Sequence, residues 1–168
     1  SASPYSNIRG TQCPITPCQP HRVSYSSSMP ETSIVAPINT DREFTLAGPA
    51  TLEGTSLHTG QKVNLTIKPA PGGHGFKFCR VDLPDKPIID ADVSRVEQVE
   101  RATTLASGSV RVHTVEHVLS ALTGMGVDNA LIEMDANEPP IGDGSARPFV
   151  DLIRKAGVEE QESRRKTW

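Results

Sequence analysis

Glu116 and His117 are an adjacent acid and histidine within RVHTVEHVLSALTGMGVDN, residues 111–129. Thr114 is a preferred N-cap residue, so this pair is predicted to lie in the first turn of a helix. The positive end of the helix dipole favours an ionised carboxylate there and disfavours protonation of an imidazole. A neutral histidine and an ionised carboxylate suit a metal ligand and a general base. An ordinary solvated first turn is the competing interpretation, and by residue type it is the more frequent one.

The helix prediction rests on the residues that follow. Val115, Val118, Leu119 and Leu122 recur at helical spacing and form one apolar stripe. The glycines at 124 and 126 then allow a left-handed exit from the helix.

The remaining histidines give weaker signals. His113 and His117 are four residues apart and could chelate a metal, but HTVEH places its glutamate differently from the HExxH zinc motif. His113 also precedes the predicted N-cap, which assigns it to the incoming strand. His58 lies in a turn-rich segment, His74 is predicted to be exposed in a glycine-flanked loop, and His21 lies in the N-terminal tail.

Asp143 lies in the turn IGDGS, just before a second predicted helix that Ser145 caps and in which Pro148 occupies the first turn. A structural role is favoured for Asp143, as an acceptor for backbone N–H groups at this helix start. Gly142 and Gly144 permit a tight turn but do not form a phosphate-binding pattern.

Composition excludes several classes of protein. The chain has 168 residues and a net charge of −3, so it shows no basic footprint for nucleic acid or an anionic membrane. No apolar run approaches the roughly 20 residues of a membrane-spanning helix. Three cysteines, at 13, 18 and 79, make neither a disulfide framework nor a zinc spacing, which favours a reducing compartment.

The chain divides into three predicted parts. Residues 1–40 are rich in Ser and Pro and are expected to be disordered, residues 41–160 to fold, and residues 161–168 to begin a linker. Strands are expected at 44–52 with a break near 48–49, and at 63–67, 76–80, 88–93, 102–105, 110–112 and 130–134. Strands with two amphipathic helices predict an α+β two-layer sandwich, a mostly antiparallel sheet with both helices on one face.

The first 30 residues contain no acid but include Arg9 and Arg22, a composition that resembles a transit peptide. An upstream artefact and a translation start at Met29 are the alternatives.

From about Phe44 to Gln161 the chain resembles the N-terminal half of UDP-3-O-acyl-N-acetylglucosamine deacetylase, the zinc hydrolase of lipid A biosynthesis. The matching segments are LEGTSLHTG, VNLTIKPAP, RATTL, VHTVEHVLSALTGMGVDNALIEMD and EPPIGDGSARPFVDLIRKAG. The resemblance implies two similar domains, each a sheet with two helices on one face, and an active site between them. Two residues depart from the family pattern: Ser56 replaces a glycine, and Gly142 replaces a large apolar residue.

The resemblance also implies roles for single residues. His117 would be a ligand of Zn²⁺ and Glu116 the general base, with His58 and Asp143 as further catalytic residues. The substrate would be a UDP-linked acylated amino sugar, and the reaction would release acetate and a free 2-amino sugar in the bacterial cytoplasm. The alternative is that the chain is an organellar relative of the family, located in an organelle.

The family's other zinc ligands, a histidine and an aspartate, belong to a second domain that residues 158–168 cannot supply. The chain is therefore expected to be an N-terminal fragment that binds zinc poorly and is inactive alone. A non-catalytic remnant that binds a partner or a nucleotide sugar is the alternative, and a fused dehydratase domain is a third possibility on which these residues have no bearing.

Overall fold

A five-stranded sheet is the centre of the folded part of the chain. The computed structural model describes residues 41–98 and 102–166, so the predicted tail at 1–40 lies outside the described residues. The sheet has the order β2-β3-β9-β4-β5, and every neighbouring pair is antiparallel except β4 and β9. Its strands are β2 (Ala50–Thr55), β3 (Lys62–Pro69), β9 (Ala130–Met134), β4 (Phe76–Arg80) and β5 (Ile88–Asp90).

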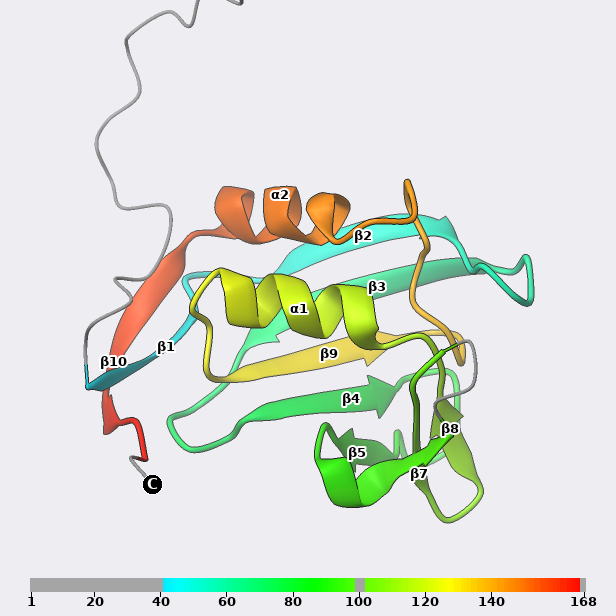
Figure 1. The fold of residues 1–168 in the computed structure, drawn as a ribbon, viewed down its shortest axis with the longest axis horizontal. Helices are drawn as coiled ribbons and strands as arrows, with labels where there is room; N and C mark the ends of the chain where they lie inside the picture. Colours follow the sequence, from blue (N-terminus) through cyan, green and yellow to red (C-terminus); the bar gives the residue numbers. More distant parts are fainter. Residues whose placement is uncertain (1–40, 99–101, 167–168) are drawn as a thin grey trace, which may run out of the picture. The chain divides into compact units, whose positions relative to one another are not determined.

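Both helices, α1 (Glu116–Gly124) and α2 (Arg147–Ala156), cover the same face of this sheet (Figure 1). The alternation along β3 explains why: Val63, Leu65 and Ile67 are buried, whereas their neighbours Asn64 and Lys68 lie on the opposite, polar face. The predicted α+β two-layer sandwich is confirmed.

The core lies between the helices and the sheet. It joins the apolar stripe of α1 to the inward-facing residues of the three central strands and to α2. Its largest fully buried side chains are Phe78, Phe149, Leu46, Leu65, Ile67, Ile89, Leu122, Ile132, Met134, Ile153 and Val63. The stripe predicted for α1 is confirmed, with Val115, Val118 and Leu122 buried and Leu119 packed against the core.

Two smaller sheets flank the central one. The antiparallel strands β6 (Val96–Gln98), β7 (Thr104–Ser107) and β8 (Val110–Val112) form the first, and the predicted turn at 107–108 joins β7 to β8. The strand predicted at 88–93 is shorter, because β5 ends at Asp90 and a 3-10 turn follows at Val93–Arg95.

The second small sheet pairs β1 (Arg42–Leu46) with β10 (Val158–Arg164) in antiparallel register. Residues 161–164, which the sequence assigned to the start of a linker, lie instead in β10. The strand alternates partly buried residues, such as Gln161 and Ser163, with exposed charged ones.

Glu43 fastens this small sheet to the rest of the fold. Its carboxylate is 9% exposed and accepts hydrogen bonds from the Gly73 N–H (2.7 Å), the Asn129 amide (3.0 Å) and the Ser163 hydroxyl (2.7 Å). Burial by itself would raise the pKa of Glu43, but these hydrogen bonds outweigh it and lower the pKa below its usual value.

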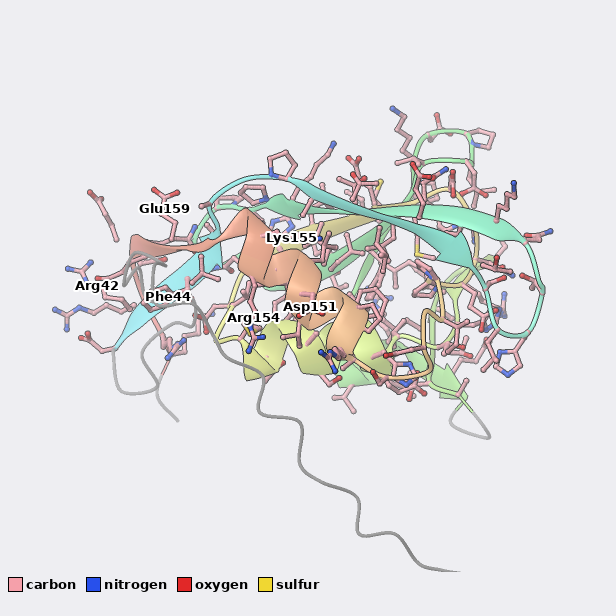
Figure 2. The ribbon with its side chains drawn as sticks, turned by 90° about the horizontal axis from the view of Figure 1, so that it is seen from above. Arg42, Phe44, Asp151, Arg154, Lys155 and Glu159 are labelled. Carbon is pink, nitrogen blue, oxygen red and sulfur yellow. The ribbon has the colours of Figure 1, made fainter. Side chains whose placement is uncertain are left out.

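The outer face of α2 is charged. Asp151, Arg154 and Lys155 lie along it, near the start of β10 (Figure 2), and Asp151 pairs at 3.8 Å with both Arg147 and Arg154. Among the described helices, neither is long and apolar enough to cross a membrane.

Candidate active site

Helix α1 places Glu116 and His117 in its first turn, as the sequence predicts. Its cap differs from the prediction, because Val115 is the N-cap residue and no side chain caps the helix. Thr114 has a left-handed φ of +55°, and its hydroxyl donates to the Glu138 carboxylate (2.7 Å). A positive φ is unfavourable for a β-branched residue and is kept only where the surroundings enforce it. The hydroxyl expected to cap the helix therefore serves a longer-range contact.

The two oxygens of Glu116 have different surroundings. Oε1 accepts a hydrogen bond from the backbone N–H of Thr103, on the segment leading into β7. Oε2 is buried and has no hydrogen-bond partner among the described residues. An unpartnered buried carboxylate oxygen is costly in a folded protein and calls for an explanation, such as a ligand or a catalytic role. The carboxylate is thus held through Oε1, whereas the buried Oε2 has no partner among the described residues.

His113 makes its hydrogen bonds to residues outside α1. Its backbone N–H donates to the Asn137 carbonyl (2.8 Å), and its Nδ1 lies 2.9 Å from the Thr104 hydroxyl. The sequence assigns His113 to the incoming strand, and in the structure it is the first residue after that strand, β8.

His58 lies in the loop between β2 and β3, which Ser56 closes. The Ser56 hydroxyl hydrogen-bonds that of Thr59 and accepts from the Gln61 N–H (3.2 Å). Ser56, which replaces the glycine of the family pattern, is only 3% exposed, and its hydrogen bonds stabilise the turn. The same residue forms a β-bridge with Pro140, which draws the loop onto the segment after β9.

Glu138 connects the His58 loop to the segment before α1, although the sequence did not predict a role for it. It is 1% exposed, and its carboxylate binds the His58 N–H (3.0 Å), the His58 Nδ1 (2.7 Å) and the Thr114 hydroxyl (2.7 Å). Burial by itself would raise the pKa of Glu138, but the hydrogen bonds from His58 and Thr114 outweigh it and lower the pKa. The loop of His58 and the start of α1 are therefore attached to one buried anion.

Asp143 is exposed, and its carboxylate accepts from the N–H (3.0 Å) and the hydroxyl (2.7 Å) of Ser145. These hydrogen bonds with Ser145 lower the pKa of Asp143. The Ser145 hydroxyl in turn accepts from the Arg147 N–H (3.1 Å), so it serves the helix start although Ala146 is the N-cap residue. The structural role predicted for Asp143 is present, and its hydrogen bonds stay within its own turn.

Comparison with known proteins identifies the family. A family model described as UDP-3-O-acyl N-acetylglycosamine deacetylase matches residues 43–168. The chain belongs to this deacetylase family. A UDP-3-O-acyl-N-acetylglucosamine deacetylase of Methylococcus capsulatus is 50% identical over 122 residues, which are 73% of this chain and 40% of that protein. Proteins of the same name from Teredinibacter turnerae and Myxococcus xanthus are 49% and 51% identical, over 74% and 71% of this chain and 41% and 38% of their own lengths.

The chain therefore spans about two fifths of the length of the deacetylases it matches. Catalytic zinc usually takes three protein ligands, and the described residues contain no group of three His, Cys, Asp or Glu side chains that could hold a metal ion. The donor chemistry fits zinc only in part: His117, the residue after Glu116 in the first turn of α1, can supply one ligand.

One histidine prediction was wrong. His74 is half-buried rather than exposed, and its Nε2 is buried with no hydrogen-bond partner among the described residues. Burial, followed by the charge of Lys77, lowers the pKa of His74. The flanking glycines suggested a solvated loop, but they let the chain turn His74 inward against the sheet.

Proposed function

We propose that this chain is the N-terminal half of a zinc-dependent deacetylase that removes the N-acetyl group from a UDP-3-O-acyl-N-acetylglucosamine, in the cytoplasm, as a step of lipid A biosynthesis. Membership of the deacetylase family and the names of the relatives support the reaction and substrate class. The part of the enzyme beyond this chain would complete the site.

The observation that carries the proposal is the carboxylate of Glu116. A general base must present a free oxygen to the proton it accepts and must be held still while doing so. The Thr103 N–H holds Oε1, and Oε2 is shielded from solvent without a hydrogen bond to any residue that the structure describes. An acid with only a structural role would satisfy both oxygens.

The proposed roles are those that the family resemblance implies, and the contacts of Glu116 support the first of them. Glu116 accepts a proton from the attacking water, and the adjacent His117 contributes one ligand of the metal. Zinc, when bound, polarises the amide carbonyl and lowers the pKa of water. His58 is proposed to meet the substrate, because its side chain is 49% exposed while its Nδ1 is anchored. Asp143 is proposed to act at the edge of the site, where it shapes the turn before α2.

A second candidate is a remnant that binds a partner or a nucleotide sugar without catalysis. It is favoured by the lack of a complete metal-donor set among the described residues.

A chimera distinguishes the two. Residues 43–168 of this chain would replace the matching segment of the Methylococcus capsulatus relative, and zinc content and acetate release would be measured. We expect one zinc per molecule and turnover, loss of zinc in His117→Ala, and retention in the control His113→Ala. An inactive, folded chimera would favour the remnant, and zinc loss in both variants would favour the two-histidine site. The 168-residue chain alone is expected to bind zinc poorly and to be inactive.

A further inference from the structure

Glu138 has an unusual position for an acidic residue. It lies in the loop after β9, between two segments far from it in sequence, with only 1% of its surface exposed. A buried carboxylate is strongly destabilising unless hydrogen-bond donors compensate it. Three donors do so here: the N–H and ring Nδ1 of His58, 80 residues earlier, and the hydroxyl of Thr114.

These contacts determine the state of the His58 ring. An ionised carboxylate can only accept hydrogen bonds, so Nδ1 must carry the proton that lies between it and Oε1. In the neutral ring, Nε2 is then the unprotonated nitrogen, available as a proton acceptor. The side chain is 49% exposed, and no described residue hydrogen-bonds Nε2.

The same carboxylate oxygen also receives the Thr114 hydroxyl, two residues before Glu116. Thr114 keeps its left-handed backbone while making this bond. Oε1 is therefore shared between His58 and the entrance to α1, and displacing it would move both.

We propose that Glu138 is a positioning residue for His58, an inference that rests on the proposed function. Glu138 fixes the Nδ1–H tautomer and the orientation of the His58 ring, and it keeps that ring at a constant position relative to the start of α1. Glu138 acts on the reaction through His58, its contact with Thr114 serves to fix the position of that ring relative to α1, and Glu138 does not itself meet the substrate.

The tautomer can be measured on the 168-residue chain without any activity. Nitrogen-15 NMR of histidine-labelled protein, at a pH where the ring is neutral, distinguishes the two tautomers, and His58→Ala assigns the signal. We expect the Nδ1–H form for His58. The Nε2–H form would overturn the proposal even if every Glu138 variant failed to fold, and even if the deacetylase proposal were correct.

Activity of the chimera supplies the second test. Glu138→Gln keeps the size of the side chain but replaces one acceptor oxygen with a donor, and we expect kcat to fall about tenfold or more. Because Glu138 acts through His58, the same change in a His58→Ala background should cost less than about twofold. Equal losses in both backgrounds would overturn the proposal.

Glu133→Gln is the matched control, since Glu133 pairs with Lys68 (2.7 Å) on the polar face of the sheet. It should leave kcat unchanged, and a loss equal to that of Glu138→Gln would overturn the assignment. If the chimera is inactive while His58 shows the Nδ1–H form, the proposed function fails and the positioning contact stands.

Discussion

Replacing Glu43 by glutamine should weaken the attachment of the β1–β10 sheet. All three donors to Glu43 converge on its Oε2, and the residue is 9% exposed. A hydrogen bond to a charged acceptor contributes about 1 kcal/mol more than one to a neutral acceptor. Three such differences, partly offset because the buried charge is removed, predict a loss of about 2 kcal/mol in the free energy of unfolding at pH 7.

The effect should depend on pH with a defined sign. The folded-state pKa of Glu43 is lowered, so its ionisation stabilises the fold above the unfolded-state pKa of about 4.3, and this contribution is lost as pH falls through the folded-state pKa. The difference between wild type and Glu43→Gln should therefore be full at pH 7 and shrink below about pH 4.

Urea unfolding of the 168-residue chain, followed by circular dichroism at several pH values, measures this difference. Glu160→Gln is the matched control, because Glu160 lies on the same small sheet, is 55% exposed and pairs with Arg42 at 3.9 Å. That control should change stability by less than about 0.5 kcal/mol. A Glu43→Gln effect no larger than the control, or one that does not change with pH, would show that the ionised Glu43 does not hold this sheet in place.

Two pairs of substitutions test the packing of the fold. Gly142→Ala should destabilise the fold by about 1–3 kcal/mol in urea unfolding, because φ is +58° and a Cβ would lie 2.8 Å from Pro148 Cγ; Gly124→Ala, where a Cβ has open space, should be neutral or slightly stabilising. Ile132→Ala, fully buried in the central strand β9, should cost about 2–5 kcal/mol, whereas Leu131→Ala on the opposite face should cost clearly less. Equal effects within either pair would contradict the packing described.

Local pattern was sufficient to predict the main elements. The alternation of β3 and the stripe of α1 reflect burial on one face, which repeats at the period of each element. The first-turn position of Glu116 and His117 follows from the same helix.

The contacts that complete the site could not be predicted in this way. Glu138 lies in a loop beside two prolines, where an acid is normally solvated, and its partner His58 is 80 residues away. The residue type of Thr114 predicts a helix cap, but its hydroxyl donates to the buried Glu138 carboxylate and does not cap the helix. The one hint in the sequence that Glu138 is buried is its place in a largely apolar segment, before Pro139, Pro140 and Ile141.

Strand β10 shows the same limit. Its sequence, VEEQESR, is polar and charged, and residues 161–164 of it are predicted from the sequence to begin a linker. It pairs with β1 because Gln161 and Ser163 turn inward to meet Asn129 (2.8 Å) and Glu43 (2.7 Å). The inward-facing residues Gln161 and Ser163 are polar, so hydrophobic periodicity does not predict this part of the strand.

Glu116→Gln in the chimera is the most direct test of the proposal that Glu116 is the general base. The amide keeps the size of the side chain and its contact with the Thr103 N–H, but it cannot accept the proton. We expect kcat to fall by about 10²–10⁴-fold with zinc content unchanged. Turnover within a few-fold of wild type would contradict it.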